Sequence, residues 1–306
     1  MTSDINYKGR VAIVTGAGNG LGREHALLLA SRGAQVVVND LGGQVDGSGA
    51  SSGPADRVAA EIRDAGGEAV ANASSVVTPE GGQEIVTAAL DAFGRVDIVI
   101  NNAGILRDST FAKLDTETWD AVLNVHLRGA MCVTRAAWNH MKNQAYGRIV
   151  NTSSNAGIFG NFGQANYGAA KAGLIGLTRV LAQEGKKYGI LANVVAPIAR
   201  TRMTEELLGK LASKLNPSLV SPVVAYLASE TCRESGEIYS VGGGRVSRLF
   251  IAATRGIFEP NLTVEDVADR LGEIRDEANY VVPMSTPEET ALFVSAIKSA
   301  GHAAAV

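Results

Sequence analysis

The sequence predicts an α/β fold in which a doubly wound, parallel sheet of seven strands lies between two layers of helices. Short apolar runs alternate along the chain with longer segments of helical length. The apolar runs are continuous and rich in β-branched residues, which is typical of strands that are buried on both faces. Repeated βα units of this kind build a three-layer sheet domain.

The strands and helices follow one another in regular order. Strands are expected at residues 11–17, 35–40, 68–73, 96–104, 147–154, 190–197 and 236–244. Helices are expected between them at residues 21–32, 55–65, 80–93, 117–142, 165–187 and 220–229.

Two segments depart from this rhythm. Residues 41–54 are rich in Gly and Ser, which predicts a long exposed loop with either a ligand role or none. After the sheet domain expected at 1–244, residues 245–306 should form a helical C-terminal extension. This extension should pack on the sheet domain or on a second subunit.

Two helices are predicted within the extension. The first spans 263–277 and is opened by Thr263. The second spans 286–300, where Thr286 and Glu289 would form a capping box around a proline at the first helical position.

Composition excludes several classes of protein. The 306 residues include 46% hydrophobic side chains, as is ordinary for a globular protein, and a net charge of −3 argues against a nucleic-acid partner. Cys132 and Cys232 lack CxxC spacing, which fits a reducing compartment, and the four histidines show no metal-binding pattern. No stretch resembles a secretory signal or a membrane span, so we expect no metal, no membrane insertion and a cytoplasmic location.

The strongest functional signal is a tyrosine and a lysine four residues apart. Tyr167 and Lys171 would share one face of a helix, thirteen residues after Ser154. Lowering the pKa of a phenol by about 3 units requires roughly 4 kcal/mol, much of which a neighbouring ammonium can supply. The three residues could therefore form a proton-transfer site for an alcohol or ketone, although such a pair can also lie on an ordinary helix surface.

A glycine-rich turn, TGAGNGLG at residues 15–22, follows the first strand and opens the first helix. Glycines at such a junction permit a tight turn and let the backbone approach a pyrophosphate at the helix N-terminus. The alternative is a plain loop. In this strand-to-helix setting we expect a Rossmann-like dinucleotide site that involves Gly16, Asn19, Gly20, Leu21 and Gly22.

Asp40 bears on which dinucleotide would bind. It ends the second predicted strand, where a carboxylate accepts hydrogen bonds from ribose hydroxyls and repels a 2′-phosphate. Positions 39 and 41 carry no arginine that would attract that phosphate. NAD is therefore favoured over NADP, unless Asp40 only caps a loop.

Together these motifs resemble the short-chain dehydrogenase/reductase family. The resemblance covers about residues 8–244 and rests on residues 15–22, the NNAG motif at 101–104, Asn124, and the Ser154, Tyr167 and Lys171 set. The stretches VVVNDLGG, NNAGILRD, VHLRG, TRAAW and IFGNFGQANY are most similar to the (3R)-hydroxyacyl-CoA dehydrogenase group. That group includes part of the peroxisomal multifunctional enzyme, which also accepts 17β-hydroxysteroids, and stand-alone actinobacterial relatives.

The resemblance implies a role for each catalytic candidate. Tyr167 would be the general base in oxidation and the general acid in reduction. Lys171 would also hold the nicotinamide ribose, and Ser154 would orient the substrate oxygen. Asn124 would join a water relay from Lys171 to solvent, unless it only bonds the helix backbone.

The resemblance also implies cofactor contacts from other strand ends. They involve Asn101 and the residues Asn102, Ala103, Gly104, Ser75, Val76, Pro197, Ile198 and Thr201. Two features depart from the family pattern. The usual Asp after the third strand is replaced by Ser74 and Ser75, and the usual Pro-Gly pair reads Pro197-Ile198.

Substrate recognition should depend on less regular segments. Ile158, Phe159 and Phe162 would line an apolar slot or belong to the core, and residues 201–216 would form a helical lid. Three arginines of the extension could bind CoA phosphates or remain solvated; they are Arg245, Arg248 and Arg255.

The sequence therefore favours an NAD-dependent oxidoreductase that acts on a secondary alcohol. The favoured substrate is a (3R)-3-hydroxyacyl-CoA, and a 17β-hydroxysteroid is the rival within the enzyme class. An idle NAD-binding sensor or scaffold is the alternative outside it. By analogy with related dehydrogenases, the helices expected at 117–142 and 165–187 would pair across a homodimer interface.

Overall fold

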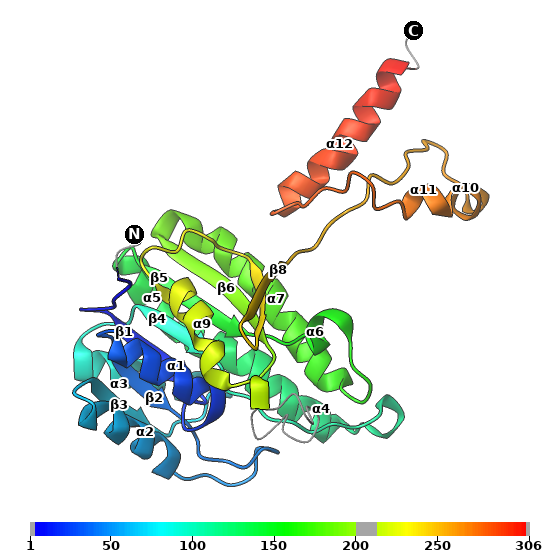
Figure 1. The fold of residues 1–306 in the computed structure, drawn as a ribbon. Coiled ribbons are helices and arrows are strands. Elements are labelled where there is room, and N and C mark those ends of the chain that lie inside the picture. The colour runs from blue at the N-terminus through cyan, green and yellow to red at the C-terminus, as the bar shows by residue number, and fades with distance from the viewer. Residues whose placement is uncertain (1–3, 200–212, 304–306) are drawn as a thin grey trace. The chain divides into compact units, whose positions relative to one another are not determined.

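The computed structural model describes residues 4–199 and 213–303. The chain divides into two compact units, with the boundary between Arg248 and Leu249. Figure 1 shows the first unit as a sheet with its covering helices. The second unit, described separately below, contains the last three helices.

The first unit is built on one eight-stranded sheet in the order β3-β2-β1-β4-β5-β6-β7-β8. The strands are β1 (Val11–Thr15), β2 (Gln35–Asn39), β3 (Glu68–Asn72), β4 (Ile98–Asn101), β5 (Gly147–Thr152), β6 (Ile190–Pro197), β7 (Ile238–Gly242) and β8 (Arg245–Leu249). Neighbouring strands from β3 through β7 are parallel. The predicted fold class is confirmed, but the expected seven strands are joined by β8, which lies in the segment assigned to the extension.

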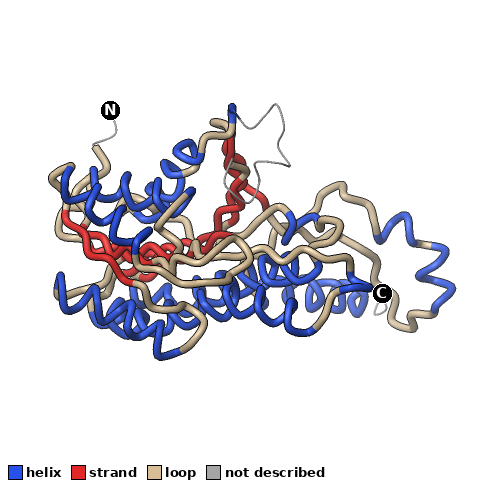
Figure 2. Tube along the Cα trace, turned by 90° about the horizontal axis from the view of Figure 1, so that it is seen from below, coloured by secondary structure: helices blue, strands red, loops and turns tan. Residues whose placement is uncertain are grey.

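Helices cover both faces of the sheet, and Figure 2 shows the strands running between two helical layers. The longer helices are α1 (Gly20–Ser31), α2 (Gly53–Asp64), α3 (Pro79–Phe93), α4 (Thr116–Leu123), α5 (Gly129–Asn143), α7 (Ala165–Gly185) and α9 (Ser221–Ala228). Shorter turns are η1 (Phe111–Lys113), η2 (Asn124–Arg128), α6 (Ala156–Phe159), η3 (Lys186–Tyr188) and η5 (Pro217–Leu219).

Two hydrophobic cores lie on opposite faces of the sheet because successive strand side chains point in opposite directions. In β1, Ala12 and Val14 pack with α1, α2 and α9. Val11 and Ile13 pack with α3 and α5. All four side chains are fully buried, which explains why β1 reads as a continuous apolar run.

The single helix expected at 117–142 is interrupted. A π-helical turn, η2, separates α4 from α5, and the Gly129 N–H bonds the Asn124 carbonyl five residues earlier. Such a turn inserts one extra residue into the helix and rotates the side chains that follow, and π turns are frequent at functional sites.

The second unit contains α10 (Val264–Asp269), α11 (Leu271–Ile274) and α12 (Thr286–Ala303). Thr263 and Asp266 form a capping box at the start of α10, as the position of Thr263 suggests. The predicted Thr286–Glu289 box is wrong. Ser285 lies before the helix and exchanges hydrogen bonds with Glu288, three residues later, so the cap begins one residue earlier than expected.

Each predicted strand of the first unit except that at 190–197 is longer than the strand observed, and most of the excess is at the carboxyl end. The residues that follow β1, β2, β3, β4 and β5 turn away from the sheet and gather at one edge. In an open parallel sheet this edge is where ligands bind. The fold thus collects the chemically distinctive residues of the sequence in one place.

Candidate active site

A cleft of about 580 Å³ opens at the carboxyl ends of the strands. Most of the predicted site residues line it. They are Gly16, Asn19, Gly20, Leu21, Asp40, Ser75, Val76, Asn102, Ala103, Gly104, Ser154, Tyr167, Lys171, Pro197 and Ile198. Gly22 and Asn124 do not line the cleft, and Thr201 lies outside the described residues.

The glycine-rich turn forms one wall of the cleft. Gly16 has a φ of +63°, a conformation that glycine adopts without strain. Gly22 lies behind the wall, where an added Cβ would come within 2.3 Å of the Gly16 carbonyl. Asn19 makes no side-chain cap, and the first turn of α1 carries no acidic residue. The helix N-terminus is therefore available to an anion, as a dinucleotide pyrophosphate requires.

Asp40 is fixed at the edge of the cleft by two backbone donors. The Gly18 N–H donates to Oδ2 and the Gly42 N–H donates to Oδ1, each at 2.7 Å. The carboxylate therefore does cap a loop, and its unused lone pairs remain available to the cleft. The two roles suggested by the sequence are compatible.

The turn after β4 is clamped to the glycine-rich turn. Asn102 donates to the carbonyls of Thr15 and Gly16, at 3.0 and 3.1 Å, and the Thr15 hydroxyl accepts from the Asn102 and Ala103 N–H groups. Asn101 has a different, buried environment, where it donates to Thr134 and Asn151. The side chain of Asn101 thus links β4 to α5 and β5 behind the cleft.

The Gly/Ser-rich loop, residues 41–54, is hydrogen-bonded to the segment that follows β4. The Leu106 N–H donates to the Val45 carbonyl at 2.9 Å, and Arg107 Nε donates to the Asp46 carbonyl at 2.8 Å. Val45 and Gly47 line the cleft. The sequence predicted an exposed loop and left its role open. The structure makes it a wall of the site.

Ser154, Tyr167 and Lys171 converge within the cleft. Ser154 follows β5, accepts a hydrogen bond from the Ala156 N–H at 3.2 Å and contacts the Tyr167 phenol. Tyr167 and Lys171 lie one turn apart on α7, with Lys171 Nζ 5.5 Å from the centroid of the tyrosine ring. The Lys171 amine donates to the Thr152 carbonyl. These groups come from β5 and α7, whose packing fixes their spacing.

The start of α7 is held against the segment that follows β4. The Asn166 side chain donates to the Arg107 carbonyl at 3.0 Å, and Gln164 donates to the Asp108 carboxylate at 2.8 Å. Because Asn166 directly precedes Tyr167, these bonds fix the position of the phenol relative to the cleft.

Burial dominates the ionisation of the Tyr167–Lys171 pair. The Lys171 side chain is 3% exposed, and burial lowers its pKa to about 7. Burial also raises the pKa of Tyr167, and a hydrogen bond with Ser154 partly offsets this effect. In the protein alone, the pKa of Tyr167 is therefore shifted in the direction opposite to that expected from a neighbouring ammonium, because the desolvation of both groups favours their neutral forms.

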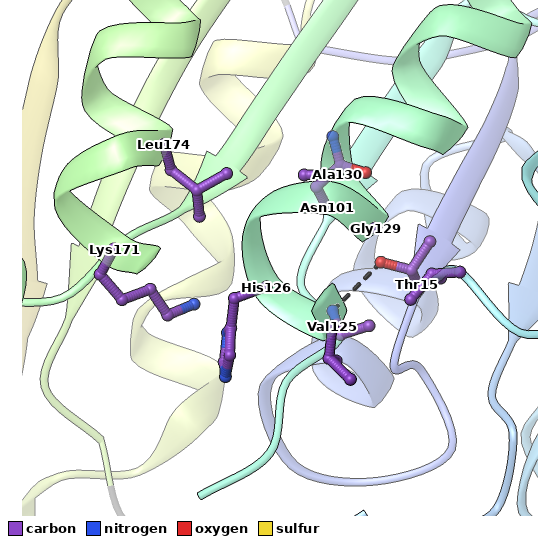
Figure 3. Close-up of a pocket in the computed structure, with 10 residues that line it drawn as sticks. Thr15, Asn101, Val125, His126, Gly129, Ala130, Lys171 and Leu174 are labelled. Carbon is purple, nitrogen blue, oxygen red and sulfur yellow. Dashed lines mark hydrogen bonds between the residues drawn. The ribbon is translucent and has the colours of Figure 1, made fainter. Parts of the chain in front are cut away.

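His126 is a site residue that the sequence reasoning missed. It lies two residues after Asn124 within the π turn, lines the main cleft and, with Lys171, also lines a smaller adjoining pocket. Figure 3 shows the Lys171 side chain extending from its helix toward His126. The unusual turn that places it there is not visible in the periodicity of the sequence, although His126 lies in VHLRG, one of the stretches that carry the family resemblance.

The expected substrate-side residues are arranged differently. Phe159 and Phe162 are 73% and 89% exposed, so they belong neither to the core nor to the wall of the cleft. Most of the lid expected at residues 201–216 lies outside the described residues, because these omit 201–212.

The three tail arginines all have protein partners. Arg245 donates to Ser247, Arg248 pairs with Glu237, and Arg255 donates to the Asn279 carbonyl. Contact with CoA phosphates therefore remains a prediction from the sequence.

Neither a metal centre nor a membrane span is found among the described residues. No cluster of three or more His, Cys, Asp or Glu side chains there is arranged to hold a metal ion. Within the same residues, no helix has the length and apolar character needed to cross a bilayer.

Comparisons with known proteins agree with this geometry. The family model for short chain dehydrogenases matches residues 10–211. A short-chain type dehydrogenase/reductase of Mycobacterium tuberculosis is 57% identical over 87% of this chain and 94% of its own length. A hydroxyacyl-CoA dehydrogenase of the same organism is 39% identical, with 90% of each chain covered.

A solved structure is similar over almost the whole chain. The full-length peroxisomal multifunctional enzyme type 2 of Drosophila melanogaster aligns with a TM-score of 0.81 and 39% identity. The alignment covers 96% of the present chain and 50% of that protein. The present chain thus spans about half the length of this multifunctional relative.

The buried lysine gives a testable dependence of stability on pH. Its pKa falls from 10.5 in the ordinary state to about 7 in the fold, so between these values the unfolded chain binds more protons and the native protein gains stability as pH rises. Lys171→Met abolishes this gain. We expect the stability of the variant relative to wild type to fall by up to ~1.4 kcal/mol per pH unit above pH 7.

Urea unfolding at several pH values between 7 and 9.5 measures the difference in unfolding free energy between the wild type and Lys171→Met. Lys113→Met, at an exposed position, is the control and should show a difference that hardly changes with pH. A pH-independent difference for Lys171→Met as well would show that the amine is not buried as described.

Proposed function

Because this chain belongs to the short-chain dehydrogenase family, we propose that it oxidises a (3R)-3-hydroxyacyl-CoA to the 3-oxoacyl-CoA with NAD. It is an oxidoreductase that acts on CH–OH groups of small molecules with a nicotinamide cofactor. The observation that carries the proposal is the convergence of Ser154, Tyr167 and Lys171 in a cleft whose other wall is a glycine-rich helix start.

The residues present fit a dinucleotide. The bare N-terminus of α1 suits a pyrophosphate, and Asp40 lies at the end of the second strand, where ribose hydroxyls would reach it. We assign Ser75, Val76 and the Asn102–Gly104 turn to the adenosine half, and Pro197, Ile198 and Thr201 to the nicotinamide half. A bound oxidised nicotinamide would supply the acceptor for the hydride that leaves the carbinol carbon.

In the proposed reaction, Ser154 donates a hydrogen bond to the substrate oxygen and holds it beside Tyr167. The ionised phenol of Tyr167 takes the hydroxyl proton as the carbon–oxygen double bond forms. In the reverse direction the phenol returns the proton to the ketone oxygen. Ser154 is suited to both directions because its hydroxyl can donate and accept.

Lys171 makes the phenol a usable base only when the amine is protonated. In the protein alone, burial opposes that state, as the lowered pKa of Lys171 shows. Ribose hydroxyls placed beside the amine would give it polar partners in addition to the Thr152 carbonyl. We infer that the proton-transfer site is completed only when the cofactor binds.

The role of Asn124 as a relay residue remains a proposal. Its side chain does not line the cleft, and its backbone carbonyl accepts the π-type bond from Gly129. Any contribution from Asn124 would therefore come through the shape of the turn that carries His126.

The acyl-CoA substrate is favoured over other alcohols by similarity to the hydroxyacyl-CoA dehydrogenase of Mycobacterium tuberculosis. Exposed aromatic residues near the mouth of the site also suit an apolar chain. Ser109 pairs with Gln164 by a β-bridge, which brings the segment of Phe111 close to that of Phe162. A 17β-hydroxysteroid would use the same catalytic groups and is tested beside the acyl-CoA.

We further propose a homodimer in which α5 and α7 pair with those of a second copy. Ala172, Gly176 and Val180 form an exposed line of small apolar residues on α7, spaced four residues apart. Met131 on α5 is also exposed. In this proposal residues 1–244 carry the catalysis, and the extension, 245–306, packs on the sheet domain or on the partner.

A turnover screen tests the reaction directly. NAD is offered with (3R)- and (3S)-3-hydroxyacyl-CoAs of several chain lengths, with an estradiol-like steroid and with short free alcohols. We expect the (3R)-acyl-CoAs to give the highest kcat/KM. A preference for the free alcohols or the steroid would reject the acyl-CoA assignment.

Tyr167→Phe is the catalytic control in the same screen. It should lower turnover by at least about 100-fold, because general acid–base catalysis contributes that much, and leave NADH affinity nearly unchanged. An idle NAD-binding protein would show no turnover with or without the substitution.

Asp40→Asn tests the choice of dinucleotide. The variant keeps one side-chain oxygen that can accept from the backbone but loses the charge that would repel a 2′-phosphate. We expect the ratio of kcat/KM for NAD to that for NADP to fall by about 10-fold or more. Asp46→Asn, which removes a carboxylate of the same loop outside the cleft lining, is the matched control, and equal ratios in the two variants would refute the role of Asp40.

Sedimentation velocity tests the oligomeric state. At micromolar concentration the wild type should sediment as a dimer or a larger assembly, whereas Val180→Glu should shift it toward monomer by placing a charge in the apolar interface. A wild-type monomer would contradict the interface.

A further inference from the structure

The loop formed by residues 41–54 reaches from one strand of the sheet to another. It begins at the carboxyl end of β2, and its middle is hydrogen-bonded to the segment that follows β4. In the sheet, β1 lies between β2 and β4. The loop therefore crosses the carboxyl end of β1, where the glycine-rich turn forms the proposed pyrophosphate site.

The loop has internal structure of its own. Its ends are joined, since the Ser51 N–H donates to the Leu41 carbonyl at 2.8 Å. Gly42 permits this close approach, because an added Cβ there would lie 1.8 Å from the Ser51 carbonyl oxygen. Within the loop, the Gly47 N–H donates to the Gln44 carbonyl at 3.0 Å. Joined ends and internal contacts are typical of an Ω-loop, a kind of loop that frequently has a function.

The loop and the glycine-rich turn border the same space. Both line the main cleft, and the lining residues of the loop are Leu41, Gly43, Gln44, Val45 and Gly47. The end of the loop also approaches the turn, because an added Cβ on Gly18 would lie 2.6 Å from the Cβ of Pro54. A dinucleotide bound at this turn would therefore also contact the loop.

Two hydrogen bonds hold the middle of the loop to the segment after β4. One joins two backbone groups, the Leu106 N–H and the Val45 carbonyl. The other uses the side chain of Arg107, whose Nε donates to the Asp46 carbonyl at 2.8 Å. The backbone carbonyl of Arg107 accepts from Asn166 at the start of α7. The side chain that holds the loop is therefore attached to the same backbone that anchors the catalytic helix.

We propose that Arg107 is a positioning residue: its side chain holds residues 41–54 over the dinucleotide site and thereby slows release of the cofactor. For the cofactor to leave, the loop moves away from the cleft, and the Arg107 bond adds to the free energy of that opening. Such opening steps can limit the release of a bound product. This inference rests on the proposed function for the identity of the cofactor, a nicotinamide dinucleotide.

Two substitutions separate the hydrogen bond from the charge. Arg107→Met removes the donor, keeps an aliphatic stem and leaves the backbone carbonyl that accepts from Asn166. Asp46→Asn is the matched control. It removes the carboxylate on which Arg107 acts electrostatically, but it keeps the backbone carbonyl that accepts the Nε hydrogen bond.

The test is the rate at which NADH leaves the protein. Protein loaded with NADH is mixed in a stopped-flow instrument with an excess of NAD, and the loss of bound NADH fluorescence is followed. We expect Arg107→Met to release NADH about fivefold faster than wild type, because one hydrogen bond contributes about that much. Asp46→Asn should release it at nearly the wild-type rate. Equal rates in wild type and Arg107→Met, or equal acceleration in both variants, would overturn the proposal.

A second readout needs no cofactor. In the protein alone, Arg107→Met should speed amide hydrogen exchange in residues 41–54 and leave exchange in α7 unchanged, whereas Asp46→Asn should change neither. Unchanged exchange of the loop in Arg107→Met would also overturn the proposal. If the wild type binds NADH but oxidises no alcohol, the proposed reaction fails, while the release rates still decide the role of Arg107.

Discussion

The site depends on one energetically unfavourable arrangement, in which a lysine amine is buried in the cleft wall beside a phenol. An amine that leaves water loses hydration, and here the loss brings the pKa of Lys171 to about 7. The fold holds the amine there through the carbonyl of Thr152, at the end of β5, and through the packing of α7 on the sheet. The proposed role of Tyr167 as a base depends on that amine.

The surrounding structure explains how this arrangement is maintained. α7 is anchored at its start to the segment after β4, and that segment is bonded in turn to the loop that follows Asp40. A continuous set of backbone and side-chain bonds therefore joins the proposed ribose-binding carboxylate to the proposed catalytic tyrosine. The proposed cofactor-binding residues and the proposed catalytic residues are thus held by one connected set of hydrogen bonds.

Local features of the sequence allowed much of the fold and of the candidate site to be predicted. The i, i+4 spacing of Tyr167 and Lys171 holds wherever α7 forms, and the β-branched run around Ile13 marks a strand with two buried faces. The glycine-rich turn after the first strand predicted the start of a helix, and α1 begins there at Gly20. Each of these inferences depends on residues that are close in the sequence.

The remaining features arise from contacts between distant segments or from irregular backbone. A regular 3.6-residue period cannot reveal the extra residue of the π turn, so the sequence directed attention to Asn124 instead of His126. The loop after Asp40 looked free because its partners are Leu106 and Arg107. The pKa of Tyr167 could not be read from its lysine neighbour, since the burial of both groups is set by tertiary packing.

The most direct test of this account is the titration of Lys171 itself. In protein carrying ¹³C at the lysine ε-carbons, the Lys171 resonance can be identified by its loss in the methionine variant and followed with pH. The account predicts a midpoint near 7 in the protein without cofactor. A midpoint close to the ordinary value of 10.5 would mean that the amine is solvated, and the central claim would be wrong.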